Sequence, residues 1–202
     1  TTHINDLLAL VSSLRLGRVH LVGTSSGALI ALLAALRNPA MVRTLTLGEP
    51  TAFSLLQGRE DSLAKAFQRA IYGPAGRALA EKQMKRGVRI FLDGLLGQEG
   101  AFDRLPPALR KSLMQNAPAL GLETASIRNV PPVRCADLQS APFPILLLSG
   151  KHSPQIFHRI TETLARCLPS SERVTLDRSS HGLEFQSAQE FNTNVLTFLA
   201  NH

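Results

Sequence analysis

Residue types suited to nucleophilic catalysis occur at widely separated positions of this 202-residue sequence. The sharpest is Ser25 in Gly23-Thr24-Ser25-Ser26-Gly27, which has the spacing G-x-S-x-G. Such a turn holds the serine in a strained backbone conformation, and we expect both glycines to relieve crowding between strand and helix. The N–H of Ser26, at the helix start, is then expected to stabilise an oxyanion. We therefore predict that Ser25 is a nucleophile.

A serine hydroxyl needs a base, and His181 is the best placed of the six histidines. It lies in the loop Ser179-Ser180-His181-Gly182, after the last predicted strand, where the order serine, acid, histidine would put it. His20 is expected to be structural, and His152, in a strand-end loop, is a weaker candidate for lining the pocket. We predict that His181 is the general base.

The orienting acid is predicted to be Glu49, which directly follows the strand next to that of Ser25. Adjacent parallel strands lie about 4.8 Å apart, so both residues would emerge at the same sheet edge. Pro50 is expected to hold Glu49 in an extended conformation. Asp177 is the alternative acid, although its closeness to His181 in the sequence favours local capping of the loop.

Structural interpretations of the same residues remain open. The serine turn could cap a helix or bind phosphate, His181 could be a solvated loop residue, and Glu49 could lie on the surface. A Walker loop is excluded because no Gly-Lys-Ser/Thr follows Gly27. A dinucleotide fingerprint is excluded as well, since Ser25 occupies the place of its second glycine.

The elements that would position these residues alternate between helices and strands. Apolar spacing and breaker residues predict helices over 3–16 and 26–37, and strands over 18–23, 43–48, 144–150 and 173–177. Ser153 is expected to be the N-cap of a helix that begins at Pro154. A capping box, Ser187 to Glu190, would start the last helix. This order predicts an α/β fold with a parallel sheet.

Residues 52–135 differ in character, because short helical patterns there alternate with Gly and Pro and no strong strand is found. We expect this segment to be a helical cap inserted into a core formed by residues 1–51 and 136–202. Its phenylalanines suggest a modest apolar acyl or alcohol group in the substrate: Phe53, Phe67, Phe91 and Phe102.

Composition excludes several classes of protein. The net charge of +7 comes from scattered Lys and Arg, and aromatic residues are only 5%, which argues against a nucleic-acid site. The longest apolar stretch, Ala28 to Leu36, is too short to span a bilayer, and we expect no signal peptide because the first residues lack a basic region followed by an apolar one. Cys135 and Cys167 could pair, but two cysteines do not make a disulfide framework, and we expect buried or incidental thiols in a reduced, cytoplasmic protein with neither a metal nor a cofactor.

These motifs together resemble the α/β-hydrolase-fold proteins over nearly the whole sequence. His20 to Gly27 looks like the nucleophile elbow, Pro144 to Gly150 like the strand that often precedes the acid, and Ser180-His181-Gly182 like the histidine loop. The resemblance implies a small-cap serine hydrolase that cleaves an ester, with a lactone or a carbon–carbon bond beside a ketone as alternatives. Some members place their acid as Glu49 is placed. Ser25 argues against dehalogenases and epoxide hydrolases, which need Asp there.

Two features depart from the family. Gly150-Lys151-His152-Ser153 has Ser where the pattern G-x-x-D has its acid, and only one helix precedes Arg18, where the family has four strands. Those strands would complete the sheet and supply a second oxyanion N–H. We therefore expect a shortened or proteolysed chain, or pairing with another chain such as a homo-oligomer. The alternative function is a non-catalytic binding or assembly module with the same fold.

Overall fold

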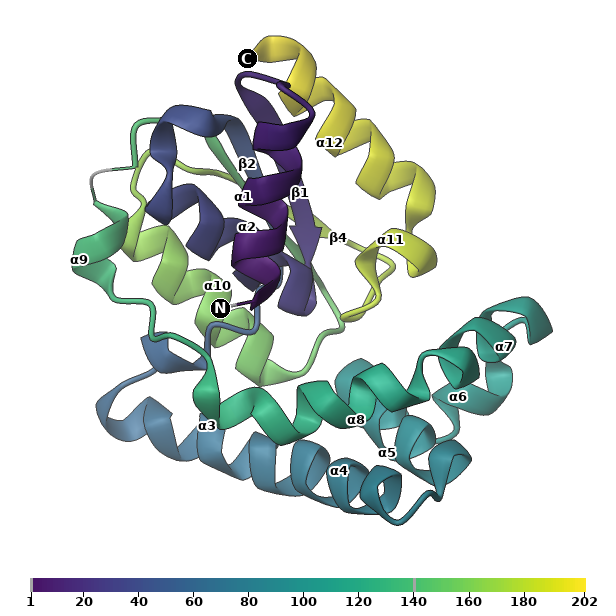
Figure 1. Cartoon of the computed structure of the whole chain (residues 1–202). Helices are drawn as coiled ribbons and strands as arrows, with labels where there is room; N and C mark the ends of the chain where they lie inside the picture. Colours follow the sequence, from purple (N-terminus) through teal and green to yellow (C-terminus); the bar gives the residue numbers. More distant parts are fainter. Residues whose placement is uncertain (1, 140) are drawn as a thin grey trace. The chain divides into compact units, whose positions relative to one another are not determined.

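The computed structural model describes residues 2–139 and 141–202. The chain forms two compact units, one made of Thr1–Gln57 and Pro131–His202 and the other of Gly58–Val130 (Figure 1). The first contains the sheet and the second is helical. Residues 52–57 and 131–135 therefore group with the sheet, whereas the sequence placed them in the helical segment.

Four parallel strands form one sheet in the order β1-β2-β3-β4. The bounds are β1 (Val19–Thr24), β2 (Val42–Gly48), β3 (Ile145–Gly150) and β4 (Glu172–Leu176). All but one residue of β2 and every residue of β3 are buried, as expected for central parallel strands covered on both faces. The predicted parallel α/β class is confirmed.

Register aligns the carboxyl ends of these strands. Thr24 of β1 pairs with Gly48 of β2, Gly48 pairs with Leu148 of β3, and Gly150 pairs with Leu176 of β4. The loops that follow the strands consequently start at one edge of the sheet.

Helices cover both faces of this sheet. Figure 1 shows α12 (Ala188–Asn201) on one side of the strands, and α2 (Ser25–Arg37) and α10 (Gln155–Cys167) on the other. Helix α12 packs Phe191, Val195 and Phe198 against leucines of β3 and β4. The other α-helices described for this unit are α1 (Thr2–Ser13), α9 (Cys135–Leu138) and α11 (Leu183–Gln186).

The predicted capping box at the start of α12 does not form. Ser187 is the N-cap residue, but its hydroxyl makes no capping bond and is buried without a partner among the described residues. Its backbone, at φ −134° and ψ 48°, lies outside the extended region that such a box uses. Apolar packing of α12 on the sheet therefore accounts for the helix better than its cap does.

The helical unit has its own apolar core. It contains α3 (Asp61–Phe67), a π-helical turn (Gln68–Tyr72), α4 (Gly73–Ala80), α5 (Met84–Leu96), α6 (Ala101–Arg104), α7 (Pro107–Gln115) and α8 (Ala117–Ser126). No strand occurs among the residues described for this unit. Leu79, Val88 and Phe102 are among the side chains of its core, so Phe102 packs within the unit itself.

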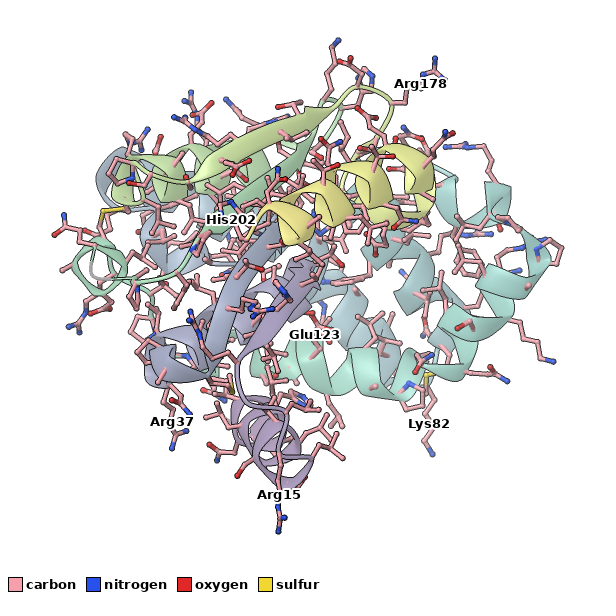
Figure 2. The ribbon with its side chains drawn as sticks, turned by 90° about the horizontal axis from the view of Figure 1, so that it is seen from above. Arg15, Arg37, Lys82, Glu123, Arg178 and His202 are labelled. Carbon is pink, nitrogen blue, oxygen red and sulfur yellow. A yellow bond between two sulfur atoms is a disulfide. The ribbon has the colours of Figure 1, made fainter. Side chains whose placement is uncertain are left out.

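A disulfide joins Cys135 of α9 to Cys167 at the end of α10 (yellow bond in Figure 2). The prediction of two incidental thiols is wrong. The cysteines are 32 residues apart in sequence, and only the packing of α9 against α10 brings their Cα atoms to 5.1 Å, a separation suited to a disulfide. The expectation of a reduced compartment relied on those thiols and loses that support.

Basic side chains are dispersed over the sheet unit. Arg15, Arg37 and Arg178 come from separate elements and extend away from the ribbon (Figure 2). Within residues 2–139 and 141–202, no helix combines the length and the apolar character needed to cross a membrane.

Candidate active site

Ser25 lies at a tight turn between β1 and α2. Its φ of 55° is in the left-handed region, which costs a residue other than glycine roughly 1–3 kcal/mol. A Cβ atom at Gly23 would lie 2.6 Å from the carbonyl oxygen of Gly27, so only glycine fits there. Gly27 is exposed, and a Cβ atom there would meet nothing within 4 Å. The expectation that both glycines relieve crowding therefore holds for Gly23 alone.

Glu49 follows β2 at the position beside Ser25, because Gly48 pairs with Thr24. The N–H of Thr51 donates to the carbonyl oxygen of Ser25 at 3.4 Å, which ties the two turns together. The side chain of Glu49 is completely buried. Its position at the carboxyl edge agrees with the register expected for adjacent strands.

The expected extended conformation of Glu49 is wrong, since its φ is 42°, in the left-handed region. The carboxylate is turned inward, where Oε1 accepts the N–H of Gly150 at 2.8 Å and Oε2 accepts the hydroxyl of Ser153 at 2.9 Å. The N–H of Glu49 donates to the carbonyl oxygen of Leu148 at 3.1 Å. These bonds over-determine the backbone and outweigh the preference set by the following proline.

His181 lies between Ser25 and Glu49. Its Nδ1 is 2.8 Å from Oε2 of Glu49, and its Nε2 is 2.9 Å from Oγ of Ser25. The ring is largely buried, and the ring of Phe157 stacks on it with a centroid separation of 3.7 Å and an interplanar angle of 18°. The structure thus joins three side chains from distant parts of the sequence in one line of hydrogen bonds.

The histidine loop is held by further contacts at the carboxyl edge. The N–H of Ser180, next to His181, donates to Oε1 of Gln186 in α11 at 2.8 Å. Ser179 and Ser180 are both buried. The loop is consequently packed into the protein, in contrast to the solvated loop that was the structural alternative.

The alternative acid, Asp177, lies apart from this line of contacts. Its exposed carboxylate pairs with the ammonium group of Lys151 at 2.9 Å. The hydrogen bond and charge of Lys151 lower the pKa of Asp177 below its ordinary value. His152, considered as a pocket residue, is exposed.

Ser26 is the second residue of α2, and the N–H groups of a first helical turn have no acceptor within the helix. Its N–H is therefore available at the nucleophile turn, next to the positive end of the helix dipole. Its role as an oxyanion donor stays a prediction.

Three residues of the site were missed or misjudged from the sequence. Ser153 was expected to cap α10, but the N-cap residue is Pro154 and no side chain caps this helix. Phe157 showed only the apolar spacing of a helix face, and Gln186 gave no signal. The one usable hint was the position of Ser153, three residues after Gly150, where a family acid would stand.

Among the described residues, no group of three or more His, Cys, Asp or Glu side chains is arranged to hold a metal ion.

The sequence is similar to those of known proteins. A model described as "Alpha/beta hydrolase family" matches residues 1–193. The "Putative carbamate hydrolase RutD" of Agrobacterium fabrum is 27% identical over 209 residues, which cover 96% of this chain and 72% of that protein.

Solved structures share the fold at low sequence identity. MenH from S. aureus has a TM-score of 0.75 at 18% identity, covering 98% of this chain and 74% of that one. An esterase from Exiguobacterium antarcticum has a TM-score of 0.75 at 18% identity, covering 98% and 72%. Est816, described as an N-acyl homoserine lactone degrading enzyme, has a TM-score of 0.68 at 20% identity, covering 98% and 73%.

Proposed function

Because the chain belongs to the alpha/beta hydrolase family, we propose that it hydrolyses an ester or a related acyl bond with a serine nucleophile. In this proposal Ser25 attacks the carbonyl carbon, His181 transfers the proton, and Glu49 orients the imidazole. The supporting observation is the continuous line of contacts from Ser25 through His181 to Glu49, with separations of 2.9 and 2.8 Å.

The chemistry of the buried carboxylate selects the tautomer of the histidine. An ionised carboxylate can only accept hydrogen bonds. Nδ1 of His181 therefore carries a proton, and this N–H donates a hydrogen bond to Oε2 of Glu49. Nε2 then has a free lone pair, which accepts the hydroxyl proton of Ser25. This is the arrangement that a general base needs before the nucleophile attacks.

The reaction then proceeds in two acyl transfers. Oγ of Ser25 bonds to the carbonyl carbon as Nε2 of His181 takes its proton, and that proton passes to the leaving alkoxide when the C–O bond breaks. A water molecule next attacks the acyl-enzyme and gives its proton to Nε2, which returns it to Ser25 as the acid product leaves.

Negative charge develops on the carbonyl oxygen in both steps. The N–H of Ser26 would donate to this oxyanion, helped by the α2 dipole. Loss of one such donor typically costs about 3–4 kcal/mol of transition-state stabilisation.

The substrate is proposed to be an ester, and lactones and carbamates are the related acyl compounds that the same reaction could cleave. The names of the similar proteins, a carbamate hydrolase, a lactone degrading enzyme and esterases, cover these three classes. The cap role of residues 52–135 stays a prediction from the sequence. Turnover of p-nitrophenyl acetate, p-nitrophenyl butyrate, γ-butyrolactone and a p-nitrophenyl carbamate would rank these classes.

A fluorophosphonate probe tests the nucleophile directly, because it phosphonylates activated serines. We expect one label per chain, located at Ser25 by tandem mass spectrometry and absent from Ser25→Ala. Ser171→Ala is the control, since Ser171 is a half-buried serine whose hydroxyl donates to the carbonyl of Leu168 at 2.7 Å. Labelling of another serine, or no labelling and no turnover of any of the four substrates, would contradict the proposal and favour a non-catalytic module.

A further inference from the structure

Ser153 contacts the same carboxylate oxygen that faces the proposed base. Its Oγ is 2.9 Å from Oε2 of Glu49, and Nδ1 of His181 is 2.8 Å from that oxygen. Ser153 is 8% exposed and Glu49 is fully buried. Ser153 is thus connected to Ser25 through two side chains, Glu49 and His181.

The direction of this bond follows from the charge on the carboxylate. A carboxylate only accepts hydrogen bonds, so the O–H of Ser153 donates its one hydrogen bond to Oε2 of Glu49. A buried carboxylate is strongly destabilised unless donors replace the water that it has lost. Glu49 has three such donors in the structure: the N–H of Gly150 on Oε1, with Ser153 and His181 on Oε2.

Two fixed points orient the carboxylate plane. The Gly150 N–H holds Oε1 and the Ser153 hydroxyl holds Oε2, so the terminal torsion of Glu49 cannot turn freely. With Ser153 removed, the Gly150 contact and the hydrogen bond to His181 itself would remain, and Oε2 would lose the contact that holds it independently of the imidazole. Glu has one more rotatable bond than Asp, which makes such a second contact more important here.

The chain is also shaped to allow this close approach. A Cβ atom at Gly150 would lie 2.8 Å from Oγ of Ser153 and 2.7 Å from the carbonyl oxygen of Ser179. Any side chain at position 150 would therefore push Ser153 and the histidine loop outward. The hydroxyl of Ser153 is directed at Glu49, and the N-cap residue of α10 is Pro154, whose side chain cannot cap the helix.

We propose that Ser153 is a positioning residue for hydrolysis, which fixes the Glu49 carboxylate against Nδ1 of His181. This inference rests on the proposed function, because it assigns to Ser153 a role that acts through the triad acid. Ser153 stands where an acid would be expected in a G-x-x-D pattern. In this chain it instead donates a hydrogen bond to Glu49, the proposed acid, which follows β2.

A double-mutant cycle on ester hydrolysis tests the proposal. We expect Ser153→Ala to lower kcat about tenfold, the loss expected for one hydrogen bond to a charged group, with KM changed less than about twofold. In the Glu49→Gln background, the same substitution should change kcat by less than about twofold, because the charge that Ser153 orients is already absent.

Ser149→Ala is the matched control. Ser149 is also 8% exposed, lies just before Gly150, and has its hydroxyl 3.2 Å from that of Thr175. It should lose a buried hydrogen bond and keep the wild-type kcat. Urea unfolding of every variant establishes that folded proteins are compared.

The outcomes separate this inference from the proposed function. An equal loss of kcat from Ser153→Ala in both backgrounds, or no loss in the wild-type background, would overturn the positioning role. If Glu49→Gln itself had no effect on kcat, the assignment of Glu49 as the triad acid would fail first.

Discussion

Two carboxylates in different units of this protein receive several hydrogen bonds, and they are arranged for different purposes. At the carboxyl edge of the sheet, Glu49 is fully buried, and one of its oxygens faces the imidazole of His181. At the corner between α5 and α6, Asp93 is half-buried and accepts the N–H groups of Gly100 at 2.9 Å and Phe102 at 3.0 Å. The first carboxylate contacts a titratable side chain, whereas the second accepts two backbone N–H groups.

The two regions also differ in which residues adopt a left-handed backbone conformation. Ser25 and Glu49 both have positive φ values although neither is glycine. At the Asp93 corner the left-handed positions, 97 and 100, are glycines, which adopt this conformation without strain. Arg15 and Lys82, in turns after α1 and α4, also have positive φ values. The strain at Ser25 and Glu49 therefore gains meaning only from the contacts that their side chains make with His181.

The largest expected effect comes from removing His181, the proposed base that Glu49 contacts. His181→Ala should lower kcat for ester hydrolysis by about 10⁴ to 10⁶-fold, because Ser25 then has no proton acceptor. Lys151→Ala is the control, since it removes the partner of the exposed Asp177 and should leave kcat within about twofold. Steady-state kinetics gives kcat for both variants. A His181→Ala variant that kept more than about a tenth of the wild-type kcat would contradict the role of His181 as the base.

Alanine substitutions at the two glycines of the nucleophile turn, Gly23 and Gly27, should have different effects on kcat. Gly23→Ala places a Cβ atom against the backbone of Gly27 and should lower kcat about 10²-fold by displacing Ser25. Gly27→Ala meets open space within α2 and should keep kcat while raising the free energy of unfolding by up to about 1 kcal/mol. Kinetics and urea unfolding measure both quantities, and equal effects of the two substitutions would contradict the geometry of the turn.

Much of this arrangement could be predicted from the sequence, because it depends on local patterns and on strand register. The strand expected over 18–23 is observed at Val19–Thr24, and the pairing of its end with Gly48 brings Glu49 beside Ser25. The left-handed backbone of Glu49, the donor role of Ser153 and the disulfide could not be predicted. Each depends on contacts between segments more than 30 residues apart, for which local propensities carry no information.

At the α5–α6 corner, the comparison predicts an effect on stability alone. Asp93→Asn replaces one acceptor oxygen with a donor that faces a backbone N–H, so it should lower the free energy of unfolding by about 1–2 kcal/mol. The value of kcat should stay within about twofold of wild type. A fall in kcat of tenfold or more in folded Asp93→Asn would show that this corner takes part in catalysis.

The smallest effect concerns Tyr72, a buried titratable residue of the helical unit. Burial, and secondarily the charge of Glu123, raise its pKa above the ordinary value near 10. The protonated phenol is the form that the fold accommodates. Its contribution to stability is therefore complete below about pH 10 and is lost as the pH rises further, because the unfolded chain ionises first.

Tyr72 is the only tyrosine in the sequence, so absorbance at 295 nm reports on it alone. We expect phenolate to appear only when circular dichroism shows unfolding at alkaline pH. Tyr72→Phe should show a shallower fall of the urea midpoint between pH 9 and 11. Ionisation near pH 10 in the folded protein would contradict the burial of this phenol.

The central claim, that Glu49 is the acid of a catalytic site, is tested most directly by comparing kcat of Glu49→Gln and Asp177→Asn on one p-nitrophenyl ester. We predict a loss of about 10³ to 10⁴-fold for Glu49→Gln, as expected when a histidine loses the carboxylate that sets its tautomer. Asp177→Asn should retain the wild-type kcat. A Glu49→Gln variant that hydrolyses the ester within a few-fold of the wild-type rate would contradict the account.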